Sequence, residues 1–261
     1  MPEVDGKTIF DQAAVLYDKA RPSYPEELVK DTFSYANLPA DGRILEIGCG
    51  PGKATIQFAK HGYRMLCVEP GPNLAAIARE KTRGYCVEFE VSSFEDWQVE
   101  EDAFDLAYLA SALHWLPEEI ALPKLASALK AGGTLALFWN RHPGPQSEAL
   151  EEIKAATLRY RPDHGYKSDD RESFEHSIRE QVEKIDASGL FGEVIVKTYP
   201  WAQTYSTQEY LDLLDTYSGF RVMPEDDKSA LFEEVTAIIE RHGGSVTRKY
   251  TSLLYLTRKK T

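Results

Sequence analysis

A run of closely spaced glycines, preceded by a carboxylate, is the part of this chain that points most directly to chemistry. It spans residues 46–52 and reads EIGCGPG, directly after a short apolar run. Glycines let a backbone turn sharply and approach a ligand with no Cβ in the way. Open α/β sheets bind ligands at the carboxyl ends of their strands, where such a loop would lie. The loop therefore predicts a ligand site; the alternative is a tight turn that binds nothing.

The spacing and charge of the loop separate the classes of nucleotide that it could bind. A dinucleotide fingerprint needs GxGxxG, whereas these glycines read GxGxG and Lys53 occupies the fingerprint's third position. A carboxylate at Glu46 would repel a pyrophosphate and attract an ammonium group. This favours a nucleoside that carries an amino acid over NAD, and no GxxxxGK[ST] phosphate loop is present.

A second carboxylate, Glu69, ends the next apolar run. At the end of a second strand it can accept hydrogen bonds from both hydroxyls of a ribose. The alternative is a solvated charge at the end of a strand.

The elements that would position these groups follow from the hydrophobic pattern. Strands are expected at 44–47, 65–68, 87–91, 104–109 and 134–139, and helices at 53–61, at 73–83 and in a segment that holds Leu122, Leu125 and Leu129 and ends at Gly132-Gly133. Such alternation implies parallel strands with right-handed crossovers, and therefore an α/β sandwich.

The alternation stops after Asn140. Later helices are expected at 147–160, at 173–188, after an N-cap at Thr207, and at 225–242, with strands at 194–201 and 250–257. We expect one domain over 1–261. Its parts would be an N-terminal helical strap (1–42), a cofactor-binding core (43–141), helical lid insertions (142–192 and 203–243) and two closing strands (193–202 and 246–258).

Residues 43–140 resemble the core of class I S-adenosylmethionine-dependent methyltransferases. The resemblance rests on the ExGxGxG loop, the acid after the second strand, SSFE at 92–95, FDL at 104–106 and the Gly132-Gly133 turn. It covers about half of the chain. The segments YDKARPSYP at 17–25 and SALHWL at 111–116 are similar to a small-molecule branch, the ubiquinone/menaquinone-biosynthesis and trans-aconitate methyltransferases.

The resemblance implies a Rossmann-like three-layer sandwich with a helical lid. Its mostly parallel seven-stranded sheet would have the order 3-2-1-4-5-7-6, with the last strand antiparallel. The implied activity is in-line transfer of a methyl group from S-adenosylmethionine to a small molecule, with S-adenosylhomocysteine as product and no metal.

The resemblance also implies roles for single residues. Backbone of the loop would line the methionine moiety, Glu46 would hold its ammonium directly or through water, and Glu69 would bind the ribose. Ser93 departs from the acidic residue that is often found beside the adenine in this family. The predicted cofactor-binding residues are Tyr17, Arg21, Glu46, Gly48, Cys49, Gly50, Glu69, Pro70 (against the adenine), Ser93 and Phe94 (at its exocyclic edge), and Ala110 and Ser111 (at the methionine end).

Three further predictions concern catalysis and the substrate. His114 is the candidate general base, and the alternative is a histidine that packs beside Trp115. Arg21 can clamp a carboxylate, either of the cofactor or of an acidic substrate, unless its segment only straps aromatic side chains to the sheet. The candidate substrate residues are Tyr24, Trp115, Asn140 and Arg141.

Composition narrows the class of protein. The 261 residues carry 30 Lys and Arg against 42 Asp and Glu, a net charge of −12, which disfavours nucleic acid as a partner. Three cysteines without CxxC spacing, no signal peptide and no bilayer-length apolar run predict a cytoplasmic protein. The alternatives are a macromolecule methyltransferase, a nicotinamide oxidoreductase, and a nucleoside-binding protein that lacks activity. The oligomeric state is not indicated.

Overall fold

The computed structural model describes residues 11–142, 144–161 and 171–261, and the chain divides into two compact units. The first, called here the glycine-loop unit, consists of Ser23–Asn140, Ile178–Tyr199 and Ser252–Thr261. The second, called the tyrosine unit, consists of Met1–Pro22, Arg141–Ser177 and Pro200–Thr251. The single domain and the subdivisions expected from the sequence stay predictions.

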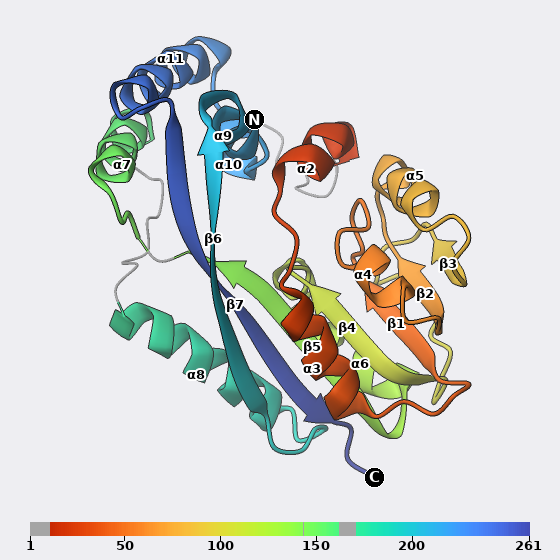
Figure 1. Ribbon diagram of the computed structural model, residues 1–261. Coiled ribbons are helices and arrows are strands. Elements are labelled where there is room, and N and C mark those ends of the chain that lie inside the picture. The colour runs from red at the N-terminus through yellow and green to blue at the C-terminus, as the bar shows by residue number, and fades with distance from the viewer. Residues whose placement is uncertain (1–10, 143, 162–170) are drawn as a thin grey trace. The chain divides into compact units, whose positions relative to one another are not determined.

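A seven-stranded sheet is the main feature of the fold (Figure 1). Its order is β3-β2-β1-β4-β5-β7-β6, as the family resemblance implies, and the pairs β1–β2, β1–β4, β2–β3 and β4–β5 are parallel. The arrow of β7 runs opposite to that of β5. The strands are β1 (Arg43–Ile47), β2 (Arg64–Val68), β3 (Val87–Glu90), β4 (Phe104–Ala110), β5 (Leu129–Arg141), β6 (Ile195–Ser206) and β7 (Ser245–Arg258).

Helices alternate with the first five strands and dominate the second half of the chain. The helices up to β5 are α2 (Ala14–Ala20), α3 (Glu26–Ala36), α4 (Thr55–Ala59), α5 (Pro72–Lys81), the 3-10 turn η1 (Leu113–Trp115) and α6 (Glu118–Ala128). Those that follow are α7 (Glu148–Tyr160), α8 (Arg171–Ala187), α9 (Thr207–Asp215), α10 (Ser218–Arg221) and α11 (Glu225–Arg241).

The strand register brings the ends of β1, β2 and β4 to the same edge of the sheet. Glu46 of β1 lies beside Cys67 of β2 and Tyr108 of β4. Fully buried residues such as Ile44 and Phe58 fill the space between this part of the sheet and α4. The loops that leave the three strands therefore start close together, which is the arrangement a ligand site needs.

The end of α6 differs from the sequence expectation. Leu129 does not continue the helix but begins β5, where it pairs with Phe104, and Gly132-Gly133 lie inside this strand. The register then shifts, so that Leu106 pairs with Thr134. The left-handed φ of 73° at Gly132 accommodates the irregularity, which sequence periodicity interpreted as a helix end.

The tyrosine unit has its own apolar core. Helix α11 packs on α7 and α9, and α2 packs on α9. Leu213, Leu231 and Val235 are fully buried among these helices. The N-cap of α9 is Ser206, not the predicted Thr207, and Ser206 forms a capping box with Glu209.

Candidate functional site

The glycine loop turns through three left-handed residues, with φ of 69° at Gly48, 54° at Gly50 and 78° at Gly52. A Cβ on Gly48 would lie 2.7 Å from the Cβ of Ala112, and one on Gly52 would lie 3.0 Å from Ala78. A Cβ on Gly50 would meet nothing within 4 Å. The outer two glycines thus serve close packing, whereas the backbone at Gly50 faces open space.

Glu69 ties this loop to the end of β2. Its two carboxylate oxygens accept hydrogen bonds from the backbone N–H groups of Gly50 and Gly71, both at 2.9 Å. Pro70 follows Glu69 and is half-buried. Glu69 thus fixes the shape of the loop, and its role in binding a ribose stays a prediction.

Glu46 lies behind the loop and is fully buried. Its Oε2 accepts hydrogen bonds from the Tyr108 hydroxyl at 2.7 Å and the Cys67 thiol at 3.5 Å, while its Oε1 is buried with no hydrogen-bond partner among the described residues. Burial raises the pKa of this carboxyl to about 7, although the hydroxyls of Thr55 and Tyr108 and the Cys67 thiol oppose the shift. The orphaned Oε1 can accept one more donor, which fits an ammonium group or a bridging water.

Two thiols adjoin this carboxyl. The pKa of Cys49 is raised to about 11, because burial and the charges of Glu46 and Glu69 outweigh the hydrogen bond to Cys67 that favours the thiolate. Burial likewise raises the pKa of Cys67. Both thiols are therefore protonated at neutral pH, so Cys49 contributes backbone and packing to the loop.

The loop after β4 begins in a strained conformation. Ser111 has a φ of 57°, donates its backbone N–H to Phe138 and shares a hydrogen bond of 3.0 Å with the Tyr24 hydroxyl. Tyr24 packs edge-on against Phe138. The structure thus brings together a predicted cofactor residue and a predicted substrate residue, next to the half-buried Ala110.

Ser93 and Phe94 lie in the loop after β3. The Ser93 hydroxyl donates to the Asp96 carboxylate at 2.7 Å and accepts from the Asp96 backbone N–H. Phe94 is buried, with its ring near Trp97 and under the Lys124 ammonium. These contacts fix both side chains within their own loop, and their role at an adenine stays a prediction.

The remaining candidates have different surroundings. His114 and Trp115 are exposed in η1, with ring centroids 4.9 Å apart. The Asn140 amide donates to the Ser23 carbonyl and accepts from the Ser252 hydroxyl at 2.6 Å. It therefore links neighbouring segments of its own unit.

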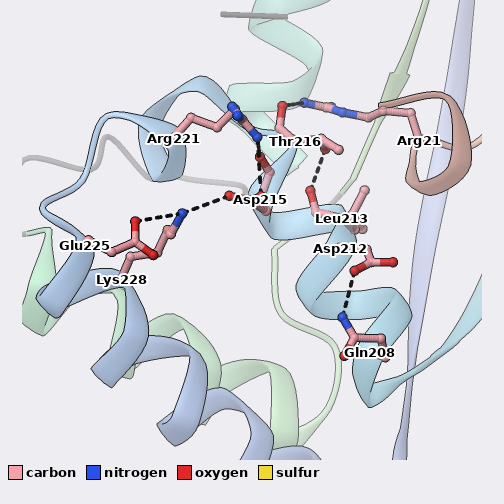
Figure 2. A network of polar contacts seen from close by, with 9 residues as sticks. All are labelled: Arg21, Gln208, Asp212, Leu213, Asp215, Thr216, Arg221, Glu225 and Lys228. Carbon is pink, nitrogen blue, oxygen red and sulfur yellow. Dashed lines mark hydrogen bonds and ion pairs between the residues drawn. The ribbon is translucent and has the colours of Figure 1, made fainter. Parts of the chain in front are cut away.

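Tyr17, Arg21 and Arg141 belong to the tyrosine unit. The Arg21 guanidinium donates to the carbonyl of Thr216 at the end of α9 (Figure 2) and lies 4.0 Å over the ring of Tyr217. It is also 5.1 Å from the ring of Tyr17. Arg141 is exposed. The roles of these three residues at the glycine loop stay predictions.

Within the described ranges, no group of three or more His, Cys, Asp or Glu side chains is placed to hold a metal ion. No helix within the same ranges is both long and apolar enough to cross a bilayer.

Comparison with known proteins assigns the fold to a family. Residues 44–133 match the family model described as a methyltransferase domain. The uncharacterized methyltransferase-like protein of Schizosaccharomyces pombe is 26% identical over 240 residues, which cover 90% of this chain and 87% of that protein. The chain is a class I S-adenosylmethionine-dependent methyltransferase.

Two further proteins are similar to this methyltransferase, one in sequence and one in fold. Trans-aconitate 2-methyltransferase of Variovorax paradoxus is 35% identical over 101 residues, which cover 38% of this chain and 39% of that protein. The solved structure of Haemonchus contortus phosphoethanolamine N-methyltransferase 2, in complex with phosphomonomethylethanolamine and S-adenosylhomocysteine, shares the fold. Its TM-score is 0.56 at 16% identity, over 100% of this chain and 62% of that one.

Sequence reasoning missed the partners of the buried carboxyl in this methyltransferase. Tyr108 and Cys67 lie on the strands that flank β1, and only the register of the parallel pairs places them beside Glu46. The available signal was a polar side chain in each of the apolar runs at 44–47, 65–68 and 104–109.

Proposed function

We propose that this methyltransferase binds S-adenosylmethionine at the glycine loop and transfers the methyl group in line to a small-molecule acceptor. One observation carries the proposal: the backbone face at Gly50 is open, and the Glu69 carboxylate at the end of β2 holds it in place. The orphaned Oε1 of Glu46 behind the loop fits the cationic end of the same ligand.

The bound cofactor would supply an electrophilic methyl group on a sulfonium, so the contribution of the chain is mainly to position the reactants. Holding reacting groups in line can supply several kcal/mol of the roughly 7–11 available to well-oriented intramolecular reactions. Glu69 and the Gly50 backbone would orient the nucleoside, and Glu46 would hold the ammonium end. No metal is needed for this division of roles.

A proton acceptor is needed only for some acceptors. A carboxylate oxygen is already ionised and attacks without a base, whereas a hydroxyl or amine must lose a proton. His114 follows β4 at the carboxyl edge of the sheet and is exposed, so it is the candidate base for acceptors of the second kind.

A small acceptor is favoured over a macromolecule by two features. The net charge of −12 opposes binding to polyanions. The residues after β4 read YLAS at 108–111 and lack the Asp/Asn-Pro-Pro-aromatic motif that amino-methylating enzymes of nucleic acids tend to carry. The similarity to a trans-aconitate methyltransferase supports the same choice.

Calorimetric titration with S-adenosylhomocysteine tests the cofactor site. The unchanged protein should bind it, and Gly50→Val should abolish binding because the side chain fills the open face. Gly62→Val is the matched control, since Gly62 has a φ of 82° and equally open surroundings away from the loop. Equal binding by all three proteins would place the cofactor elsewhere, and heat from NAD alone would overturn the methyltransferase mechanism.

A further inference from the structure

Arg248 of β7 is a partly buried arginine that has aromatic neighbours and no carboxylate partner. Its guanidinium lies 5.9 Å from the ring of Tyr210 and 5.7 Å from the ring of Tyr250, and both tyrosines are buried. Its hydrogen bond goes to the Tyr217 hydroxyl at 3.4 Å. Over the described part of the chain, no Asp or Glu forms an ion pair with Arg248. A charge partly withdrawn from water without a counter-ion is unfavourable.

A second guanidinium shares the same tyrosine. Arg21 stacks on the ring of Tyr217, and its Nε is buried with no hydrogen-bond partner among the described residues. The carboxylates nearby in the chain are already engaged. Asp212 pairs with Lys19, and Asp215 contacts both Arg221 and Lys228, as Figure 2 shows for Asp215. Among the residues that the structure describes, these two cations therefore form no ion pair with a carboxylate.

The pKa of the Tyr217 phenol reflects the positive charges of the two arginines. Burial alone would raise its pKa, yet the charges of Arg248 and Arg21 and the Arg248 hydrogen bond lower it. The cluster is therefore net positive at a position that is largely shielded from water. Such a position favours a bound anion more strongly than an exposed arginine does.

The surroundings of the arginines are aromatic and hydroxylated. Trp201 stacks on Tyr250 with centroids 4.4 Å apart, and the hydroxyls of Tyr205 and Tyr250 share a hydrogen bond of 2.8 Å. A guanidinium fork matches a carboxylate in two parallel hydrogen bonds. The aromatic rings beside the guanidinium can pack against the planar apolar part of a molecule that carries the carboxylate.

We propose that Arg248, together with Arg21 and the Tyr217 hydroxyl, binds the carboxylate of a small planar organic acid. This binding site lies within the tyrosine unit alone, and its occupancy does not depend on cofactor binding at the glycine loop.

The experiment is a calorimetric titration of the full chain with benzoate, cinnamate and fumarate, each beside its neutral amide. At least one acid should bind and its amide should not. Arg248→Gln should weaken that binding at least tenfold, whereas Arg241→Gln should leave it unchanged, because Arg241 pairs on the surface with Glu152. If no acid binds the unchanged protein, or acid and amide bind alike, the proposal is overturned without reference to any variant.

Two further measurements distinguish an organic acid from the cofactor as the molecule whose carboxylate is bound. Gly50→Val should lose S-adenosylhomocysteine and keep the acid, so failure of the cofactor site is distinguishable from failure of this one. If Arg248→Gln weakens S-adenosylhomocysteine as much as the acid, the cluster serves the cofactor's own carboxylate and the proposal is wrong.

Discussion

Glu46 illustrates how much the surroundings of one residue decide its chemistry. A carboxyl that receives a phenol hydrogen bond and is shut off from water holds its proton near neutral pH. Cofactor binding and the protonation of Glu46 are therefore linked, since a cation near Oε1 stabilises the ionised form.

The free energy of unfolding should depend on whether the Glu46 carboxyl is protonated. The pKa of Glu46 is about 7 in the folded chain against an ordinary 4.5, so the folded state binds the proton more tightly than the unfolded state. The stabilisation is complete below about pH 4.5 and is lost as pH rises to about 7, a difference of about 3 kcal/mol. Urea denaturation from pH 5 to 8 should show this fall in the unchanged protein and not in Glu46→Gln.

Glu88→Gln is the control for that measurement, because Glu88 is an exposed residue of β3. It should keep the pH dependence of the unchanged protein. Parallel curves for all three proteins would show that Glu46 titrates normally in the folded chain.

His114 should affect turnover and not cofactor affinity. If it accepts a proton from the acceptor, His114→Ala should lower the turnover number by roughly 10²–10⁴-fold with unchanged binding of S-adenosylhomocysteine. His176→Ala, at an exposed position of α8, controls for loss of a surface imidazole. Undiminished turnover in His114→Ala would assign His114 to packing beside Trp115 or to a reaction that needs no base.

Residues whose roles follow from local sequence were predictable, and those that depend on register were not. The glycine loop and Glu69 stand out because their types and spacing are unusual within the chain. Tyr108 reaches Glu46 only across a strand pair, and Arg248 meets Tyr217 from a different element. No local pattern distinguishes such a tyrosine or arginine from many others.

At the scale of elements, strand and helix order followed from periodicity, and element ends did not. Helix α6 ends and strand β5 begins without an intervening loop, and the strand register shifts near Gly132. Sequence periodicity alone does not separate that helix end from the start of the strand. The N-cap of α9 is a similar case, since Ser206 and Thr207 are adjacent and both suit the position.

The cap can be tested by mutation. Ser206→Ala removes the side-chain acceptor for the Glu209 backbone N–H and should lower the free energy of unfolding by about 1 kcal/mol. Thr207→Ala should cost less, because the Thr207 hydroxyl contacts Glu240 on an exposed surface. Urea denaturation of both variants decides between the two caps; a larger loss in Thr207→Ala would contradict the assignment.

At the scale of the whole molecule, the net charge could be predicted from the composition, but the division into two units could not. Each unit combines stretches that are far apart in the sequence, so no linker segment marks the boundary between them. The topology of the sheet entered through the resemblance to a family, because strand order beyond the fifth strand has no local signature.

The acidic balance predicts the behaviour toward nucleic acid. Fluorescence anisotropy with labelled duplex DNA and single-stranded RNA at low salt should show no binding, because a chain of net charge −12 repels phosphates. A basic DNA-binding domain serves as the positive control. Tight, salt-sensitive binding would contradict the proposal of a small-molecule acceptor.

The interleaving of the two units constrains how this enzyme can be recombined. Each unit is made of three stretches that alternate along the chain, so the polypeptide passes from one to the other at five junctions. A single crossover between two related genes at any of the three inner junctions would mix parent stretches within both units. To exchange the whole tyrosine unit and keep the whole glycine-loop unit, a hybrid must replace three separate stretches together.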